Sequence, residues 1–347
     1  MTTNSLQSLF RRPVVQAPMA VASTPSMAAS VSNAGGLGSI AIGALTVTDA
    51  ANMIRETQQR TEAAFNVNVF CHPPATRNLA AEAQWIAHLT PSFHELGATP
   101  TARLSEIYKS FLENSEALAM LLELRPPVVS FHFGLPLPDH IRALHEAGIA
   151  TFATATNLAE AHQIERAGIS AVVAQGFEAG GHRGQFDLAA HDPQLSTCVL
   201  IRLLARQVSL PIIATGGIMD RPGVIAALEA GASAVQMGTA FLLCPESAAD
   251  DAYRAALKSM AAHDTRFTSA ISGRPARGIA NRLHELGAVG PKAPCYPVAY
   301  DIGKQLNAAA RVRGDSSYAA HWAGQGAPLA REAPAATLVM ELSDGSV

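Results

Sequence analysis

The sequence is poor in charged and aromatic residues, and it contains no cluster of basic residues. Charged side chains make up 15% of the 347 residues, aromatic side chains make up 5%, and the formal net charge is −3. Such a chain offers no positive stripe for nucleic acid or for an anionic membrane surface. No segment is long and apolar enough to span a bilayer, and residues 1–12 lack the apolar core of a signal peptide. We therefore expect a cytoplasmic protein whose partners are small molecules, not nucleic acid or membranes.

Cysteine is also scarce, and its placement argues against two structural roles. No two of the four cysteines form a C-x-x-C pair. This spacing fits reduced thiols better than a disulfide framework, and it argues against structural zinc. We therefore expect no metal site. The cysteines are Cys71, Cys198, Cys244 and Cys295.

Aliphatic residues, in contrast, are abundant and occur in short regular runs. Hydrophobic residues make up 48% of the chain, which is typical of parallel strands that are buried on both faces. The runs alternate with helical patterns, and this alternation implies parallel strands joined by right-handed crossovers. Eight such units predict an α/β fold, a (β/α)8 TIM barrel, with a doubly wound sheet as the alternative. The predicted strands are 14–20, 37–43, 65–70, 128–134, 149–156, 169–177, 210–217 and 234–242.

Several of the intervening helices carry start and stop signals. Asn157 and Gly168 bracket one helical segment, and Asp220 and Gly231 bracket another, as an N-cap residue and a C-terminal glycine do. The stretch 35–41 matches a dinucleotide-binding fingerprint, but a helix precedes its glycines and a strand follows them, which is the reverse of the required order. We interpret this stretch as a helix end and a tight turn.

Two segments exceed what such a barrel requires. One lies between the third and fourth strands and has helical patterns at 80–89 and 102–112, and the other follows the last strand. Both leave the C-terminal ends of strands, where the active sites of these barrels lie. We expect them to form a cap over that face. The expected division is a barrel of residues 1–70 and 128–245, a mainly helical insert of residues 71–127 and a C-terminal extension of residues 246–347.

Turns that contain glycine follow both of the last two predicted strands. Gly216 and Gly217 end the seventh strand, and Gly238 ends the eighth. In TIM barrels the loops after these strands, together with a helix N-terminus, present backbone N–H groups to a phosphate. The turns therefore predict a phosphorylated ligand, although glycines there also permit tight turns without one.

The stretch A-Q-G-F-E-A-G-G-H-R-G at residues 174–184 follows the sixth predicted strand. Glycine is favoured where the backbone turns at positive φ or approaches another group closely. A histidine in such a loop, His182, is a candidate catalytic residue. For Glu178 and Arg183, a local ion pair that orders the loop competes with a catalytic role, and we prefer the ion pair.

A series of motifs extends through nearly the entire chain. They are PVVQAPM at 13–19, NAGGLG at 33–38, FNVNVF at 65–70, the loop at 174–184, ATGGI at 214–218, QMGT at 236–239, APCYPVAY at 293–300 and HWAGQGAPLA at 321–330. In this order they resemble the nitronate monooxygenases, formerly called 2-nitropropane dioxygenases, and their class I in particular. The resemblance implies a TIM barrel that carries FMN. It also implies a detoxifying reaction in which alkyl nitronates, notably propionate 3-nitronate, are oxidised by O₂ to aldehyde or keto products and nitrite.

The resemblance also implies roles for individual residues around the flavin. His182 matches the active-site histidine of the family, and Asn68 and Gln175 would form hydrogen bonds with the flavin ring. Other residues would line the edge of the ring or hold the ribityl chain and phosphate. These are Ala17, Pro18, Met19, Gly180, Gly181, Gly216, Gly217, Gln236, Met237, Gly238 and Thr239.

Polar side chains suited to the substrate come from the C-terminal extension and from the barrel. Tyr296, Tyr300 and Lys304 are spaced so that they could share one helix face, and the resemblance implies that they form the wall of the substrate pocket. Because a nitronate is an anion, their hydrogen-bond donors and positive charge suit it. His182 could act as a general base or, when protonated, hold the anion. For His132, a place in the site and a place as a satisfied core histidine both remain open.

Two other functions remain open from the sequence. One is an FMN-dependent NAD(P)H reductase of quinones or enoyl-thioesters, because a barrel with a flavin site does not fix the chemistry. The other is a non-catalytic flavin- or phosphate-binding barrel, which would leave His182 and the set of Tyr296, Tyr300 and Lys304 without a chemical role. The sequence fits either a monomer or a homodimer.

Overall fold

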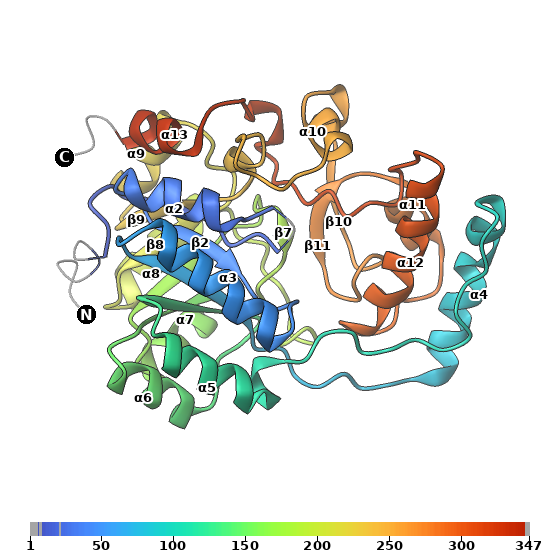
Figure 1. Cartoon of the computed structure of the whole chain (residues 1–347), viewed down its shortest axis with the longest axis horizontal. Coiled ribbons are helices and arrows are strands. Elements are labelled where there is room, and N and C mark those ends of the chain that lie inside the picture. Colours follow the sequence, from blue (N-terminus) through green and yellow to red (C-terminus); the bar gives the residue numbers. More distant parts are fainter. Residues whose placement is uncertain (1–5, 7–8, 21, 344–347) are drawn as a thin grey trace.

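The eight predicted strands are all present, and they pair in parallel. The computed structural model describes residues 6, 9–20 and 22–343 of the chain. The strands occupy the left part of the view in Figure 1. They are β1 (Val14–Gln16), β2 (Gly38–Ala41), β3 (Phe65–Phe70), β4 (Val128–His132), β5 (Ala150–Ala155), β6 (Ala171–Gln175), β8 (Ile212–Thr215) and β9 (Ala234–Met237).

The two edges of this sheet meet and close it into a barrel. The strand order is β1-β9-β8-β6-β5-β4-β3-β2, and Val15 of β1 pairs in parallel with Leu37, just before β2. A closed barrel requires this last contact, and an open doubly wound sheet lacks it. The predicted TIM barrel is therefore confirmed, and the doubly wound alternative is wrong.

The interior of the barrel changes from apolar to polar along the strands. At one end Val15, Phe152 and Ile213 pack with Leu6 and Phe10 from the N-terminal segment. This end is a filled core of the kind that TIM barrels have. Toward the C-terminal ends of the strands the buried positions are polar, so this end can bind a ligand. These positions include Asn68, Ser130, Thr154, Gln175 and Thr215.

Helices cover the outside of the barrel, and their ends agree with the sequence signals. Asn157 caps one helix and Asp220 caps another, each by accepting a hydrogen bond from a first-turn amide. Gly35 has φ +92 and lies in the turn between α2 and β2, so the glycines at 35–36 form the predicted helix end and turn. The helices around the barrel are α2 (Pro25–Asn33), α3 (Val47–Arg60), α5 (Ser115–Leu124), α6 (Pro138–Glu146), α7 (Leu158–Arg166), α8 (Thr197–Gln207), α9 (Arg221–Glu229) and α13 (Ala335–Ser343).

The last of these helices, α13, is distant in sequence from the strand that it follows in space. It packs against α2, α9 and β1, and Figure 1 shows it beside α9. It therefore takes the position of the helix expected directly after β9. The residues between β9 and α13 form a long excursion from the barrel.

The insert contains two helices with different surroundings. The helix α4 (Leu79–Glu95) packs against a helix of the C-terminal extension, and Figure 1 shows it at the right of the view, joined to the barrel by extended segments. In contrast, α5 packs against α3 and α6 and belongs to the ring around the barrel. The helix predicted at 80–89 is confirmed as part of α4.

The helix predicted at 102–112 is wrong. This stretch is irregular apart from the short 3-10 helix η1 (Phe111–Glu113). Tertiary contacts explain the difference, because the amide of Ser105 donates a hydrogen bond to Asp301 at 2.7 Å and Leu104 is buried among apolar side chains of the extension. These contacts hold the backbone in an extended path that helical propensity does not predict.

We define the cap as residues 71–114, the first part of the insert, and residues 246–334 of the C-terminal extension. Of the remaining elements, β7 and η2 belong to the barrel loops next to the cap, and the others lie within it. Trp85, Leu89 and Phe93 of α4 pack with Ile302 and Leu306 to form its apolar core. None of the helices in the described part of the chain is long and apolar enough to cross a membrane. The elements are β7 (Gly181–His182), η2 (Thr239–Phe241), α10 (Asp251–Leu257), η3 (Met260–His263), β10 (Thr265–Thr268), β11 (Ala276–Ile279), α11 (Arg282–Val289), α12 (Val298–Val312) and η4 (Ala327–Leu329).

Candidate active site

A cavity of about 370 Å³ lies between the C-terminal ends of the barrel strands and the cap. Its volume is within the range of ligand pockets, which is about 300 to 1,000 Å³. Every residue that the sequence predicted for the site lines it. These residues are Ala17, Pro18, Met19, Asn68, His132, Gln175, Gly180, Gly181, His182, Gly216, Gly217, Gln236, Met237, Gly238, Thr239, Tyr296, Tyr300 and Lys304.

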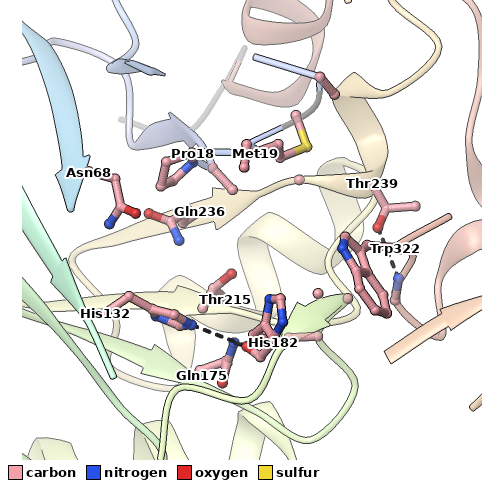
Figure 2. Close-up of a pocket in the computed structure, with 18 of the residues that line it drawn as sticks. Pro18, Met19, Asn68, His132, Gln175, His182, Thr215, Gln236, Thr239 and Trp322 are labelled. Carbon is pink, nitrogen blue, oxygen red and sulfur yellow. Dashed lines mark hydrogen bonds between the residues drawn. The ribbon is translucent and has the colours of Figure 1, made fainter. Parts of the chain in front are cut away.

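The ends of β3 and β9 place two carboxamides on one side of the cavity. Figure 2 shows Asn68 and Gln236 near Pro18, across the cavity from His132 and Gln175. The amide nitrogen of Asn68 donates to the hydroxyl of Ser130 at 2.9 Å and to its carbonyl oxygen at 3.2 Å. These bonds fix the orientation of the Asn68 side chain and leave its carbonyl oxygen for a ligand.

The carboxamide of Gln175 holds the glycine-rich loop in place. Its nitrogen donates to the backbone oxygen of His182 at 2.9 Å, and its oxygen accepts from the amide of Gly184 at 2.7 Å. Both ends of the side chain are therefore bonded to the loop. One N–H of the amide nitrogen is left for a ligand in the cavity.

The turns after β8 and β9 present unpaired backbone amides. Gly216 and Gly217 have φ values of +126 and +70, which only glycine adopts readily. No group in the described chain accepts a hydrogen bond from the amides of Gly216, Gly217, Gly238 or Thr239. Backbone amides without a protein partner are suited to the oxygens of a phosphate.

Glu178 and Arg183 do not form the ion pair expected from the sequence. Glu178 accepts hydrogen bonds from the amide and hydroxyl of Thr197, at the start of α8. Arg183 is 2% exposed and forms a bidentate pair with Asp192, at 2.8 and 2.9 Å. Each residue orders the loop through a different partner, because their side chains leave it in different directions.

His182 lies on β7, a two-residue strand that pairs with β11 of the cap. Its Nε2 is 2.9 Å from Oγ of Ser272, and its ring contacts Tyr296, Tyr300 and Trp322. Burial lowers the pKa of His182 to about 3, because removing water penalises the charged imidazolium. The imidazole is therefore neutral at pH 7.

His132 is both a lining residue and a satisfied histidine. Its Nε2 is 3.2 Å from the backbone oxygen of His182, as Figure 2 shows, and its Nδ1 is 3.0 Å from Oγ1 of Thr154. Burial lowers its pKa to about 4. Because both ring nitrogens of His132 are bonded to the protein, the side chain supports the loop and has no free nitrogen for a hydrogen bond with a ligand.

The cap supplies phenols and an ammonium group. Tyr300 and Lys304 lie on α12, whereas Tyr296 precedes this helix, so the prediction that all three share one helix face is wrong for Tyr296. The three nevertheless line the same cavity. Nζ of Lys304 lies 4.9 Å from the ring centre of Tyr108, and no carboxylate among the described residues pairs with Lys304. Its charge is therefore available to an anion.

A second part of the cap reaches the cavity through Trp322. The amide of Gly324 donates to the hydroxyl of Thr239 at 3.0 Å, shown in Figure 2. A Cβ added to Gly180 would lie 2.5 Å from the backbone of Ala323 and Gly324, so the close approach that Gly180 permits is to the protein backbone. This contact joins the glycine-rich loop to the cap.

Comparisons with known proteins agree with this geometry. The family model described as nitronate monooxygenase matches residues 4–345. A nitronate monooxygenase from Paraburkholderia phytofirmans is 55% identical over 334 residues, which cover 95% of this chain and 91% of that protein. The chain belongs to the nitronate monooxygenase family. A relative of the same name from Pseudomonas aeruginosa is 54% identical over 335 residues, 96% of this chain and 95% of that protein.

Solved structures extend the family likeness to the fold. A nitroalkane oxidase from Streptomyces ansochromogenes has a TM-score of 0.91 at 38% identity and covers 98% of this chain and 97% of its own. FabK from Thermotoga maritima has a TM-score of 0.74 at 30% identity, with 99% and 94% covered. Membership of the nitronate monooxygenase family confirms the predicted family and enzyme class, an oxidoreductase.

Several residues at this site were not predicted from the sequence. Trp322 could have been predicted, because it lies in one of the motifs that resemble the nitronate monooxygenase family. Tyr108 lies in the part of the insert without a recognisable motif. Ser272 occurs in an ordinary turn between β10 and β11, and no signal in the sequence connects it with His182.

Proposed function

We propose that this protein uses FMN to oxidise alkyl nitronates with O₂, which gives aldehyde or keto products and nitrite. The observation that carries the proposal is the division of one cavity between two kinds of groups. Unpaired backbone amides and carboxamides line the barrel side, and Lys304 without a carboxylate partner lies with tyrosines on the cap side. The first set suits a phosphorylated cofactor and the second suits an organic anion.

The residues present fit FMN. The amides of residues 216–217 and 238–239 would hold the phosphate. The carboxamides of Asn68, Gln175 and Gln236 carry both donors and acceptors, which the edge of a flavin ring requires. Pro18 and Met19 would form an apolar contact with the ring from the loop after β1. FMN bound there would supply the electron transfer, as cofactors do in such enzymes.

The cap residues would bind and orient the substrate. The ammonium group of Lys304 and the hydroxyls of Tyr296 and Tyr300 are hydrogen-bond donors, which a nitronate oxygen accepts. The rings of Tyr108 and Tyr300 lie beside the Lys304 ammonium group, so part of its surroundings is apolar, and this strengthens its attraction to an anion. Propionate 3-nitronate is the expected substrate, because it carries a second anionic group that can use the same donors.

His182 is neutral, so the role of a charged anion binder does not suit it. A neutral imidazole accepts a proton, and the proposed role is that of a base toward the protonated form of the substrate. We expect the enzyme to work in the cytoplasm as a monomer or homodimer, with O₂ and the nitronate as its small-molecule partners.

The test is an assay of the purified protein with its bound flavin. O₂ uptake and nitrite release are measured with propionate 3-nitronate, next to anaerobic bleaching of the flavin by NADH or NADPH. We expect nitronate-dependent O₂ uptake with slow bleaching, and protein stripped of flavin is the control. Rapid bleaching by NADH without nitronate turnover would overturn the proposal in favour of a reductase. Absence of both reactions would indicate a non-catalytic barrel.

A further inference from the structure

Ser272 is a buried cap residue whose hydroxyl contacts His182. Its exposed fraction is 0%, and its Oγ lies 2.9 Å from Nε2 of His182. The same oxygen is 3.1 Å from the carbonyl oxygen of Arg274 and 3.3 Å from the amide nitrogen of Arg274. Three polar atoms therefore surround one hydroxyl group.

The chemistry of these three atoms determines where the protons lie. A serine hydroxyl has one proton to donate, a backbone carbonyl can only accept, and a backbone amide can only donate. The Ser272 proton therefore goes to the Arg274 carbonyl, and Oγ accepts from both the Arg274 amide and His182. The opposite arrangement would leave two oxygens 3.1 Å apart without a proton between them. His182 consequently carries its proton on Nε2.

The other ring nitrogen of His182 is left to the cavity. Nδ1 has no hydrogen-bond partner in the described part of the chain, and it is not among the buried polar atoms that lack one. His182 lines the cavity, and Figure 2 shows its ring between His132 and Trp322. Because the ring is neutral, Nδ1 carries a lone pair and no proton.

We propose that Ser272 is a positioning residue that holds His182 as the Nε2-protonated tautomer, so that His182 offers the ligand a lone pair and no N–H. The inference rests on the proposed function and separates two tasks within it. Lys304 and the tyrosine hydroxyls bind the negative charge of the nitronate, whereas His182 receives a proton. When a neutral nitroalkane gives its α-proton to Nδ1, the C–H electron pair stays in the substrate as the C=N bond of the nitronate.

The first test measures the tautomer directly in the flavin-bound enzyme. Histidine is labelled with ¹⁵N, and the ring nitrogens are observed by two-bond ¹H–¹⁵N correlation. The signals of His182 are identified by their loss in His182→Asn. We expect Nε2 to be protonated and Nδ1 to be bare. A spectrum with the proton on Nδ1 overturns the proposal without reference to any catalytic activity.

The second test removes the hydroxyl with Ser272→Ala. Without Ser272, the Nδ1-protonated tautomer becomes accessible, and His182 can then donate a hydrogen bond to an anion. We expect a mixture of tautomers in the spectrum, and binding of sodium nitrite that is about two- to three-fold tighter, the modest gain that one added hydrogen bond gives. Binding is followed through the flavin absorbance.

Ser170→Ala is the matched control for this variant. Ser170 is also buried and accepts a hydrogen bond from a backbone amide, that of Thr151 at 3.2 Å, but it precedes β6, at the opposite end of this strand from the cavity. We expect this control to leave the His182 spectrum and nitrite binding unchanged. Unchanged His182 signals in Ser272→Ala, or weaker nitrite binding, would overturn the proposal. Nitronate turnover by the unmodified enzyme is measured separately, so a failure of the proposed function is distinguishable.

Discussion

The barrel side and the cap side of the cavity contribute different chemistry by different means. On the barrel side, residues 216–217 and 238–239, which directly follow β8 and β9, and the carboxamide of Asn68 within β3 line the cavity. On the cap side the groups are phenols, an indole and an ammonium, carried by Tyr108, Lys304 and other residues far apart in sequence. The barrel side depends on backbone amides and carboxamides held at the strand ends, whereas the cap side depends on aromatic and charged side chains.

Under the proposed function, this difference assigns binding of the cofactor and selection of the substrate to separate parts of the chain. Strand ends in a barrel have nearly fixed positions, so a cofactor common to many enzymes can be held there. A cap built from loops and short helices can change without disturbing the barrel. Substitutions on the two sides should therefore have separable effects on binding. A substitution of His182, on the strand β7 that pairs with β11, should change the reaction rate most and the binding of cofactor and substrate least.

The largest effect is expected from His182→Asn, at the junction of the two sides. Removing a general base costs about 100-fold or more in rate, so activity on a neutral nitroalkane should fall by that factor while activity on the preformed nitronate falls much less. Flavin content should be retained. Rates are measured by O₂ uptake with nitroethane and its nitronate. His145→Asn, on α6 with its own partner Thr151, is the control, and an equal loss on both substrates would argue against the base.

The next effect tests the barrel side through Gly217→Ala. Gly217 has φ +70, and an added Cβ would lie 3.1 Å from Cβ of Glu178. The strain of about 1 to 3 kcal/mol should displace the turn, so FMN affinity should fall by about ten-fold or more, which is 1.4 kcal/mol. Flavin retained per protein during dialysis is the measurement.

A matched glycine separates this effect from backbone strain alone. Gly168 has φ +77, and an added Cβ would have no neighbour within 4 Å. Gly168→Ala should lower stability but leave the flavin bound. If both variants lose flavin equally, the turn after β8 has no special part in the site.

The cap side is tested by Lys304→Met. Loss of the ammonium should raise KM for propionate 3-nitronate by about ten-fold with little change in kcat, because the charge binds the anionic substrate and its transition state about equally. Flavin content should not change. Lys258→Met is the control, since Lys258 is a cap lysine paired with Glu332 at 2.9 Å, outside the cavity. A fall in flavin content would contradict the separation of the two sides.

The smallest expected effect concerns stability against pH. Burial lowers the pKa of His132 to about 4, whereas its value in the unfolded chain is about 6.5. The unfolded chain therefore binds more protons below pH 6.5, and the free energy of unfolding should fall as the pH decreases from about 7 to 5, by at most about 1.4 kcal/mol per pH unit. Urea unfolding of the protein and of His132→Gln measures this. The variant should show a flatter dependence, and equal slopes would contradict it.

The sequence-based predictions succeeded where a local pattern or a family motif carried them. All eight strands and the glycine turns after β8 and β9 were predicted, because strand periodicity and glycine turns are local signals. The other residues at the strand ends, such as Asn68 and Gln236, were named from the family resemblance. The prediction of a helix at 102–112 was wrong because Leu104 and Ser105 are held by residues almost two hundred positions later. The predicted ion pair between Glu178 and Arg183 was wrong for a related reason. Thr197 and Asp192 lie in later segments, and the direction of each side chain depends on the folded loop.

The contacts of Ser272 and Gly180 show what no sequence pattern could supply. Ser272 reaches His182 only because β7 and β11 pair, and this pairing joins segments about 95 residues apart. Gly180 was expected to approach a ligand, and it lines the cavity, but a Cβ added to it would also meet the backbone of Ala323 and Gly324. A short local pattern cannot distinguish these two reasons for a glycine.

The position of α13 restricts how the cavity can open. Because α13 completes the ring around the barrel, the cap residues 246–334 are attached to the barrel at both ends, and residues 71–114 are attached between β3 and α5 in the same way. A segment fixed at both ends cannot swing outward on a single hinge as a terminal domain can. Entry and exit of the substrate then depend on side chains at the mouth of the cavity, such as the solvent-exposed Lys304. The enzyme should admit small ligands without a large movement of the cap.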